Sequence, residues 1–514
     1  MLAVVSSHAP LGMEGELVAV EVDIRRGLPG IDIVGLPDGA VRESKERVRV
    51  AIKNSGFAFP PDRVLISLAP AGVRKEGASF DLPIALGILA ASGQISPAGP
   101  SRSMVLGELN LSGGVRAVNG VLSAVGTGLE AGIETFLVPR ENVREARALG
   151  KGMVAGIGSL REAALALQHP EAAETREDTE TSLVEEREPE DISDIRGHNN
   201  LKRALEIAAA GRHHVLLFGP PGCGKTMAAR RLPSLLPALD REASLSVTRI
   251  HSIAGILPPG AGLVTRPPCR MPHHSASAEG ILGGGRLLRP GEVSLAHQGV
   301  LLLDEAPEFG MSLLQGLREP VEDGWVSIAR AGSTVRYPAQ IQLVLAFNPC
   351  PCGNLGKGDR VCRCTGMEIH RYWRRVGGAL LDRIDLRVPL SPVPAAEMCL
   401  PPAVQDGAAR RGRVREAVER QRVRYKGLGF SWNSRIPPGL IDLFCPLGSS
   451  ARGALLKAGN ALSLSSRAFH SVVRMARTVA DLSGEEVITE MHIIEASGLR
   501  RYGDDDFCWA TSNR

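Results

Sequence analysis

A run of eight residues near the middle of the chain has the residue types and the spacing that bind nucleotide phosphates. Residues 219–226 read GPPGCGKT and fit the phosphate-loop pattern G-x-x-x-x-G-K-[ST]. Glycines here let backbone N–H groups curl round phosphate oxygens, and a helix beginning at this point adds positive potential. We expect Lys225 to reach the β- and γ-phosphates and the Thr226 hydroxyl to bind Mg²⁺. ATP and Mg²⁺ are therefore the predicted ligands of Gly219, Pro220, Pro221, Gly222, Cys223, Gly224, Lys225 and Thr226.

Further polar residues follow two apolar runs that are typical of buried parallel strands. Residues 299–303 are followed by Asp304 and Glu305, and residues 341–346 lead to Asn348. Parallel strands deliver the residues at their carboxyl ends to a nucleotide site. We expect Asp304 to hold Mg²⁺ through water, Glu305 to orient or deprotonate the attacking water, and Asn348 to act as a sensor of the γ-phosphate.

Four of the nine cysteines lie within fifteen residues, as Cys350-x-Cys352 and Cys362-x-Cys364. Four thiolates this close in a reducing compartment indicate a tetrahedral zinc site. Two features count against zinc, because C-x-C is tighter than the usual C-x₂-C and the first pair directly follows the sensor residue. Zinc ligands and free thiols are thus the two alternatives. The remaining cysteines are scattered and predicted to be inert: Cys223, Cys269, Cys399, Cys445 and Cys508.

The hydrophobic pattern supplies the elements that position these groups. Residues 215–218 are strand-like and residues 227–232 are helix-like, which gives the phosphate loop its strand–loop–helix context. The last segment reads as helical, and residues 410–426 form a basic helix with apolar Val414, Val418 and Val423. For this basic helix a solvated face is the favoured interpretation, and DNA contact is the alternative.

Composition limits the class of protein. With 514 residues and 44% hydrophobic residues, a soluble chain of two to four domains is expected. The sequence has no apolar run of membrane-spanning length and no secretion signal, and its cysteine usage indicates the cytoplasm. Residues 171–194 hold eleven acidic and two basic residues, a charge of −9, so the rest carries +13. Residues 169–193 are predicted to be a disordered, self-repelling tether, and the basic remainder is compatible with nucleic acid.

Residues 1–168 are predicted to alternate short strands and helices. Residues 27–57 (GLPGIDIVGLPDGAVRESKERVRVAIKNSGF) and 68–93 (LAPAGVRKEGASFDLPIALGILAASG) resemble the amino-terminal domain of the ComM/YifB family of magnesium-chelatase-like ATPases. That domain in turn resembles the proteolytic domain of Lon, whose lysine activates a serine. The resemblance places Ser79 at the serine position and Leu122 at the lysine position. Because leucine cannot take a proton, we interpret this domain as a dead protease.

The resemblance extends through the predicted ATPase core, residues 194–391. It is carried by residues 272–275 (PHHS), 283–309 (GGGRLLRPGEVSLAHQGVLLLDEAPEF) and 317–353 (LREPVEDGWVSIARAGSTVRYPAQIQLVLAFNPCPCG). In this AAA+ branch, which includes magnesium chelatase and the MCM helicases, two insertions are expected. One lies near residues 283–286, and the other is a β-hairpin at residues 326–338.

The hairpin is where the resemblance to ring helicases implies DNA contact. Such hairpins face the central pore, so Arg330 and Arg336 are the predicted phosphate contacts, flanking a turn at residues 331–333. The alternative is a hairpin that only packs between subunits. For His273 and His274 the sequence indicates no chemical role, and a structural or interfacial role is favoured over metal binding.

Two more arginines receive roles from the resemblance alone. The run 380–385 (LLDRID) places Arg383 where ring ATPases reach the neighbour's nucleotide, with a surface salt bridge as the alternative. Residues 464–482 resemble the lid of magnesium-chelatase-type ATPases, in which Arg467 matches a second sensor of the γ-phosphate. Arg474 and Arg477 lie on the same helix as Arg467. They either assist it at the γ-phosphate or only support the helix.

The predicted fold is a multidomain α/β protein. It has a Lon-like (ribosomal S5-like) α+β domain (1–168), an acidic linker (169–193), an AAA+ core with a parallel sheet (194–391) and a helical lid (392–514). The resemblance implies an ATP-driven homohexameric helicase that acts on single-stranded and branched DNA with recombination proteins, promoting branch migration in natural transformation. The alternatives are a magnesium chelatase ATPase subunit and a nucleotide-gated scaffold that does not translocate.

Overall fold

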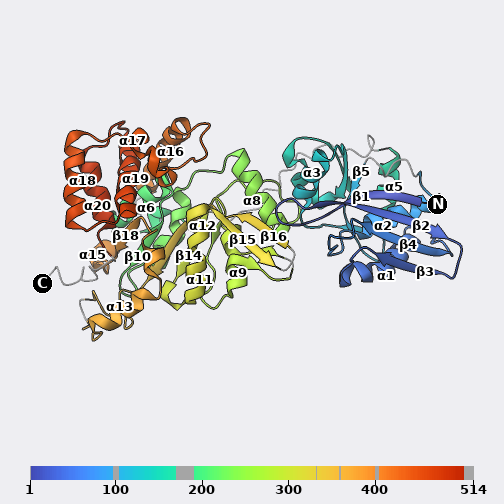
Figure 1. Ribbon diagram of the computed structural model, residues 1–514, viewed down its shortest axis with the longest axis horizontal. Coiled ribbons are helices and arrows are strands. Elements are labelled where there is room, and N and C mark those ends of the chain that lie inside the picture. The colour runs from blue at the N-terminus through green and yellow to red at the C-terminus, as the bar shows by residue number, and fades with distance from the viewer. Residues whose placement is uncertain are drawn as a thin grey trace.

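In the computed structural model the units of the chain follow one another along its long axis (Figure 1). The structure describes residues 2–96, 103–169, 190–286, 288–330, 333–357, 360–399 and 404–502. The amino-terminal domain lies at one end, the carboxy-terminal helices lie at the other, and the phosphate-loop core lies between them. Within these ranges, every helix is too short or too polar to cross a membrane.

The amino-terminal domain is a mixed sheet with helices packed on it. Among its described residues, seven strands form one sheet in the order β3-β4-β2-β1-β5-β8-β9. Its strands are β1 (Leu2–Ala9), β2 (Glu16–Arg25), β3 (Gly30–Val34), β4 (Arg63–Ala69), β5 (Ser103–Val105), β6 (Glu108–Leu109), β7 (Val115–Arg116), β8 (Thr135–Pro139) and β9 (Met153–Ile157). Its α-helices are α1 (Gly39–Asn54), α2 (Asp81–Ala91), α3 (Val121–Glu130), α4 (Val143–Ala146) and α5 (Leu160–Gln168).

Hydrophobic periodicity explains why these segments adopt their structures. In β2 alternate residues Val18, Val20 and Val22 are fully buried, which is the period-two pattern of a sheet with one covered face. Helix α2 covers that face and every one of its residues is buried. At Gly87 of α2 a Cβ would lie 2.6 Å from Val22 Cγ2, so only glycine allows the helix to approach the sheet this closely.

The phosphate-loop core contains a parallel sheet and two small hairpins. Its strands are β10 (Val215–Phe218), β11 (Cys269–Arg270), β12 (Gly283–Gly284), β13 (Arg289–Pro290), β14 (Val300–Asp304), β15 (Trp325–Arg330), β16 (Ser333–Pro338), β17 (Gln342–Phe347) and β18 (Leu386–Pro389). Its α-helices are α6 (Asn199–Gly211), α7 (Lys225–Arg231), α8 (Arg241–Ala254), α9 (Ala278–Leu282), α10 (Glu292–Leu295), α11 (Met311–Gly316), α12 (Arg318–Asp323), α13 (Gly366–Arg374), α14 (Gly378–Leu381) and α15 (Ala395–Met398). Both predicted insertions are present, as the antiparallel pairs β12–β13 and β15–β16.

Strand order brings the predicted site residues together. In the described core the parallel strands lie in the order β11-β14-β17-β10-β18. Strands β14, β17 and β10 are therefore neighbours, and each ends in a predicted functional segment. Since parallel strands present their carboxyl ends at one edge, Asp304, Asn348 and the phosphate loop meet there.

The carboxy-terminal domain is helical and shares a hydrophobic core with the sheet. Its α-helices are α16 (Val404–Arg424), α17 (Ile441–Phe444), α18 (Ser449–Ala461), α19 (Ser466–Ser483) and α20 (Glu490–Arg500). One cluster of buried side chains runs from Val215 and Leu217 of β10 to Val472 and Val479 of α19. The helical domain is thus packed onto the core through apolar contact.

The structure shortens the predicted tether at its carboxy-terminal end. Residues 170–189, most of the predicted tether, lie outside the described residues. Ile192 and Ser193 are buried, and Asp191 forms an ion pair with Arg411 of α16. These residues belong to the core because an apolar side chain and a paired carboxylate anchor them, against the prediction that the tether reaches residue 193.

Candidate nucleotide site

The phosphate loop is held ready for an anion by the side chain of Lys225. Its Nζ donates to the carbonyl oxygens of Gly219 at 2.8 Å and Pro220 at 3.0 Å, and to Oδ1 of Asn348 at 3.0 Å. Burial lowers the pKa of Lys225, although the charges of neighbouring groups oppose this shift. The ammonium group therefore sits in the loop beside the predicted sensor, where a phosphate could replace its carbonyl partners.

The predicted magnesium ligands are in direct contact. Thr226 Oγ1 donates to Asp304 Oδ2 at 2.5 Å, across the phosphate loop and the end of β14. A hydroxyl and a carboxylate oxygen form the hard donor set that Mg²⁺ prefers, so these residues fit the ion. Glu305 follows with φ of +52°, a left-handed conformation that a residue with a side chain rarely adopts. Such strain concentrates at functional positions, and it turns the exposed Glu305 away from the strand direction.

These groups open onto one cavity of about 700 Å³. The cavity lining includes seven of the predicted site residues: Pro221, Gly222, Lys225, Thr226, Asp304, Glu305 and Asn348.

The cavity also has lining residues that the sequence did not indicate. His274 Nδ1 lies 3.6 Å from a carboxylate oxygen of Glu305, which puts the unexplained histidine next to the predicted base. The ring of its neighbour His273 lies against it, with ring centroids 4.1 Å apart and an angle of 33° between the ring planes. Helix α13 contributes Glu368, Arg371 and Tyr372, followed by Arg375. His274 belongs to the run 272–275 already noted in the sequence, whereas no local motif marks the residues of α13 and Arg375, because they reach the cavity only through tertiary packing.

Arg383 and Arg467 do not line the cavity and instead share one carboxylate. Arg383 Nε donates to Glu322 Oε2 at 2.9 Å, and Arg467 donates to Glu322 Oε1. Partial burial raises the pKa of Glu322, but the hydrogen bonds and charges of the two arginines outweigh it and hold the pKa below its usual value. Within a single chain, both arginines are thus paired at Glu322 on α12, away from Lys225.

The hairpin β15–β16 has one apolar face and one polar face. Val326, Ile328, Val335 and Tyr337 are buried against the core. Arg336 pairs in register with Ser327 on the exposed face, where its guanidinium lies 5.6 Å from the Trp325 ring centroid.

The two arginines of the hairpin lie on opposite faces. Arg330 pairs with Ser333 at the tip and is exposed. It is nevertheless an even number of residues from Val326 and Ile328, so it belongs to the same face of the strand as these apolar residues. Arg330 therefore lies next to the turn, whereas Arg336 lies three residue pairs farther along the hairpin and, since side chains alternate along a strand, on the other face. Residues 331 and 332 of the predicted turn lie outside the described residues.

The apolar face of the hairpin also meets the amino-terminal domain. A Cβ at Gly12, in the turn between β1 and β2, would lie 2.8 Å from Val335 Cγ1, and Met13 packs against the same core cluster. Figure 1 shows the hairpin on the side of the core that faces this domain.

The cysteine cluster lies beside the nucleotide cavity. Ligand atoms of Cys350, Cys352, Cys362 and Cys364 all lie within 4.8 Å of one another. The four cysteines are free thiols in the structure, and Cys350 is buried while the others are partly or fully exposed.

Helix α16 is attached to the core by most of its arginines. Arg410 and Arg413 both donate to the fully buried carboxylate of Glu206 on α6, at 2.9 and 2.6 Å. The favoured interpretation of a solvated basic face is therefore wrong for these residues, because burying Glu206 requires cationic partners. Val414 and Val418 are buried as expected, whereas Val423 is 70% exposed.

The amino-terminal domain docks on α8 through the segment that contains Leu122. Ser252 of α8 accepts a hydrogen bond from Gly120 N at 2.8 Å and donates to Glu145 Oε1 at 2.5 Å. The same Glu145 oxygen accepts from Leu122 N at 2.8 Å, and the Leu122 side chain is fully buried. Burial raises the pKa of Glu145. Leu122 thus serves packing and an interdomain hydrogen-bond network, while Ser79 is partly exposed on another segment.

Family profiles and full-length relatives agree on the ancestry of the chain. Profiles described as "Magnesium chelatase, subunit ChlI", "Subunit ChlI of Mg-chelatase" and "Magnesium chelatase, subunit ChlI C-terminal" match residues 191–398, 20–142 and 405–500.

Similarity to the relatives extends over nearly the whole chain. It is 39% identical over 516 residues to the uncharacterised protein YifB of Escherichia coli (strain K12), covering 97% of each chain. It is 37% identical over 506 residues to the competence protein ComM of Haemophilus influenzae, again covering 97% of each. An uncharacterised protein of Mycobacterium tuberculosis is 40% identical over 482 residues, covering 93% of this chain and 94% of that protein. The chain therefore belongs to the ComM/YifB family of magnesium-chelatase-like AAA+ ATPases.

Proposed function

We propose that this protein is an ATP-driven DNA motor, a helicase that promotes branch migration during homologous recombination. The observation that carries the catalytic part is the meeting of Lys225, Thr226, Asp304, Glu305 and Asn348 in one cavity at the carboxyl edge of the sheet. A competence role is named for the relative ComM. By extension we propose that this chain acts on single-stranded and branched DNA, in the uptake setting of natural transformation where its host has one.

In the proposed hydrolysis each group has one task. Lys225 neutralises charge on the β- and γ-phosphates, and Asn348 holds the γ-phosphate or the attacking water. Mg²⁺ held at Thr226 and Asp304 would neutralise charge that develops on the phosphate oxygens. Glu305 orients the water and takes its proton, with His274 at 3.6 Å to fix the carboxylate. Zn²⁺ is a further proposed component, bound outside the cavity at the cysteine cluster.

We also propose a homohexameric ring, in which Arg383 and Arg467 act after assembly. Their shared partner Glu322 supplies the carboxylate oxygens that satisfy both guanidinium groups in one chain. A γ-phosphate at a subunit boundary offers the same kind of oxygen acceptors with more negative charge. The arginines would therefore exchange Glu322 for nucleotide when the ring forms.

DNA contact is assigned to the polar face and tip of the hairpin β15–β16. We expect Arg330→Ala combined with Arg336→Ala to weaken DNA binding and abolish unwinding, while basal ATPase and ring assembly stay at the wild-type level. Each lost phosphate contact should reduce the steepness of the salt dependence by roughly 0.9 for duplex DNA. A salt titration of DNA affinity measures this slope directly.

The matched control removes two arginines from α16. Arg415 is exposed and Arg422 makes only a surface pair with Glu419 at 3.6 Å, so Arg415→Ala with Arg422→Ala changes the charge equally. Wild-type slopes in the hairpin variant and a flattened slope in the α16 variant would move the DNA site to that helix.

Stimulation of ATP hydrolysis by branched DNA is the test of the whole proposal. A motor that moves on DNA should hydrolyse ATP faster on a four-way junction than without DNA, and should convert the junction to products. A magnesium chelatase subunit or a nucleotide-gated scaffold would show no such response. Absence of stimulation, with ATP binding intact, would therefore reject the DNA motor.

The amino-terminal domain is expected to have no peptidase activity. Leu122 is fully buried and offers no group to activate Ser79. Incubation of the full chain with ATP, Mg²⁺ and an unfolded protein substrate should give no cleavage above that of Ser79→Ala. Cleavage that requires ATP and disappears in Ser79→Ala would contradict this assignment.

A further inference from the structure

We infer that the four clustered cysteines bind one Zn²⁺ and that this metal supports one wall of the nucleotide cavity. The sulfur positions have the dimensions of a zinc site. Sγ of Cys350 lies 3.5 Å from that of Cys352 and 3.6 Å from that of Cys362, and Cys352 and Cys362 are 3.6 Å apart. Tetrahedral zinc with Zn–S bonds of about 2.3 Å requires S···S separations of about 3.8 Å.

A disulfide does not fit these distances. A disulfide has its sulfurs about 2.05 Å apart, far closer than the 3.5 to 3.6 Å that separates Cys350, Cys352 and Cys362. The cluster also has support for a thiolate, since the backbone N–H of Leu355 points at Cys350 Sγ at 3.4 Å. Hydrogen bonds of this kind orient metal ligands and stabilise their charge.

Charge around the cluster suits a metal with four thiolates. Each cysteine would release its thiol proton to solvent on binding, so four protons leave for one Zn²⁺ and the centre carries a net charge of −2. The segment between Cys350 and Cys364 carries three basic residues, Lys357, Arg360 and Arg363, and one acidic residue, Asp359, and its charge of +2 offsets that of the centre.

The cluster joins two segments that form the wall of the cavity. Cys350 follows the sensor Asn348 by two residues, and Pro351 itself lines the cavity. On the other side, Cys364 is followed directly by Thr365, which caps helix α13 through a reciprocal pair of hydrogen bonds with Glu368. The cluster therefore fixes the position of the first turn of α13, the helix whose residues line the cavity.

Two further contacts make this wall continuous. Trp373 Nε1 of α13 donates to the carbonyl oxygen of Pro349 at 3.0 Å. At Gly353 a Cβ would lie 2.9 Å from Pro221 Cγ, so the cysteine loop touches the phosphate loop. A metal at the cluster would hold the sensor Asn348, α13 and the phosphate loop in one arrangement. Loss of the metal would let these three segments move relative to one another.

Metal analysis of the full chain, purified with a reductant and without chelators, tests the zinc site. We expect about one zinc per chain in the wild type and in Cys399→Ser, an exposed cysteine outside the cluster. Cys362→Ser should lose most of its zinc. Because this variant could also misfold, wild-type protein is treated with a mercurial in parallel, and zinc release is followed with a reporter dye. Metal-free wild-type protein, or iron in place of zinc, would overturn the inference.

Nucleotide affinity tests the supporting role, and this part rests on the proposed ATPase site. Removing zinc from the wild type should weaken binding of a fluorescent ATP analogue by roughly tenfold, as expected when contacts to a charged group are lost. Readdition of Zn²⁺ should restore it. Unchanged affinity without zinc would overturn the supporting role.

Lys225→Ala separates this inference from the proposed function, because it should keep its full zinc content while losing nucleotide affinity. If the wild-type protein holds its full zinc content but branched DNA does not stimulate its ATP hydrolysis, only the proposed DNA motor is rejected and the zinc site stands.

Discussion

Replacing Lys225 with alanine is expected to lower the rate of ATP hydrolysis by roughly 100-fold or more, because one preorganised cationic donor is lost. The ammonium group is held within the loop by two loop carbonyls and Asn348 at 2.8 to 3.0 Å, and alanine leaves that position without a cation. Phosphate release under saturating Mg²⁺-ATP measures the rate. Lys457→Ala is the matched control, since that lysine is exposed on α18.

The paired variant Glu305→Gln should bind ATP with near wild-type affinity and fail to hydrolyse it. Glutamine keeps the size of the side chain but cannot take a proton from water, and a general base contributes roughly 10²- to 10⁴-fold. Glu305 is exposed, so the change leaves the core intact. Wild-type turnover in either variant would refute the assignment of the catalytic site.

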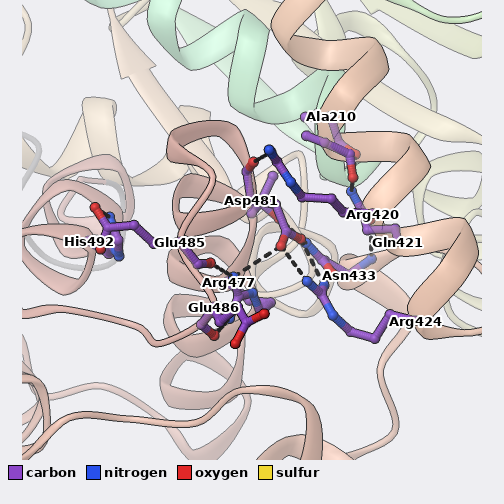
Figure 2. A network of polar contacts seen from close by, with 12 residues as sticks. Ala210, Arg420, Gln421, Arg424, Asn433, Arg477, Asp481, Glu485, Glu486 and His492 are labelled. Atoms are coloured by element: carbon purple, nitrogen blue, oxygen red, sulfur yellow. Dashed lines mark hydrogen bonds and ion pairs between the residues drawn. The ribbon is translucent and has the colours of Figure 1, made fainter.

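Replacing Asp481 with alanine is expected to destabilise the helical domain by about 3–5 kcal/mol, because it removes the only carboxylate to which its two arginine partners donate hydrogen bonds in the described part of the chain. Asp481 is fully buried at the centre of a polar network that links three segments (Figure 2). It accepts hydrogen bonds from Arg424 of α16 at 2.5 and 2.9 Å, from Arg477 of α19 at 3.0 Å, and from Asn433 at 2.8 Å. Arg477 is 1% exposed and also donates to the backbone oxygens of Glu485 and Glu486.

Chemical unfolding of the full chain, followed by a probe in the helical domain, measures this loss. Glu419→Ala removes a carboxylate from an exposed pair on α16 and should cost less than about 1 kcal/mol. A comparable, small change in both variants would mean that the arginines find other partners. The sequence left open whether Arg477 assists Arg467 or only supports their helix. Because Arg477 is buried in this network, it supports the helix and cannot reach nucleotide.

The sequence alone determined the phosphate loop and the two strand ends that complete it. Their signals are local, because a glycine pattern and an apolar run of four or five residues specify backbone shape without distant contacts. The strand order β14-β17-β10, which brings these ends together, was not predicted and comes from the structure. Residues 1–168 were predicted to alternate short strands and helices, and α1 and α2 are two of the helices that the structure forms there.

Only the tertiary structure placed His274 beside Glu305, and Arg371 and Arg375 in the same cavity. These residues come from segments whose positions depend on packing across the core, and no periodicity records that. Likewise, the sequence did not indicate Glu322, and only the structure shows that Arg383 and Arg467 both donate hydrogen bonds to it. The sequence around a charged residue does not indicate its ion-pair partner, because the two residues of an ion pair are often far apart in the chain and meet only when it folds.

The hairpin shows how one fold-level detail changed an interpretation. Its existence was readable from alternating Val326 and Ile328, but strand register places Arg330 and Arg336 on opposite faces. Similarly, the arginines of α16 looked solvated until the buried carboxylate of Glu206 was found between them. Local pattern thus determined which elements form and where phosphate binds, whereas long-range packing decided which charges remain available for a ligand.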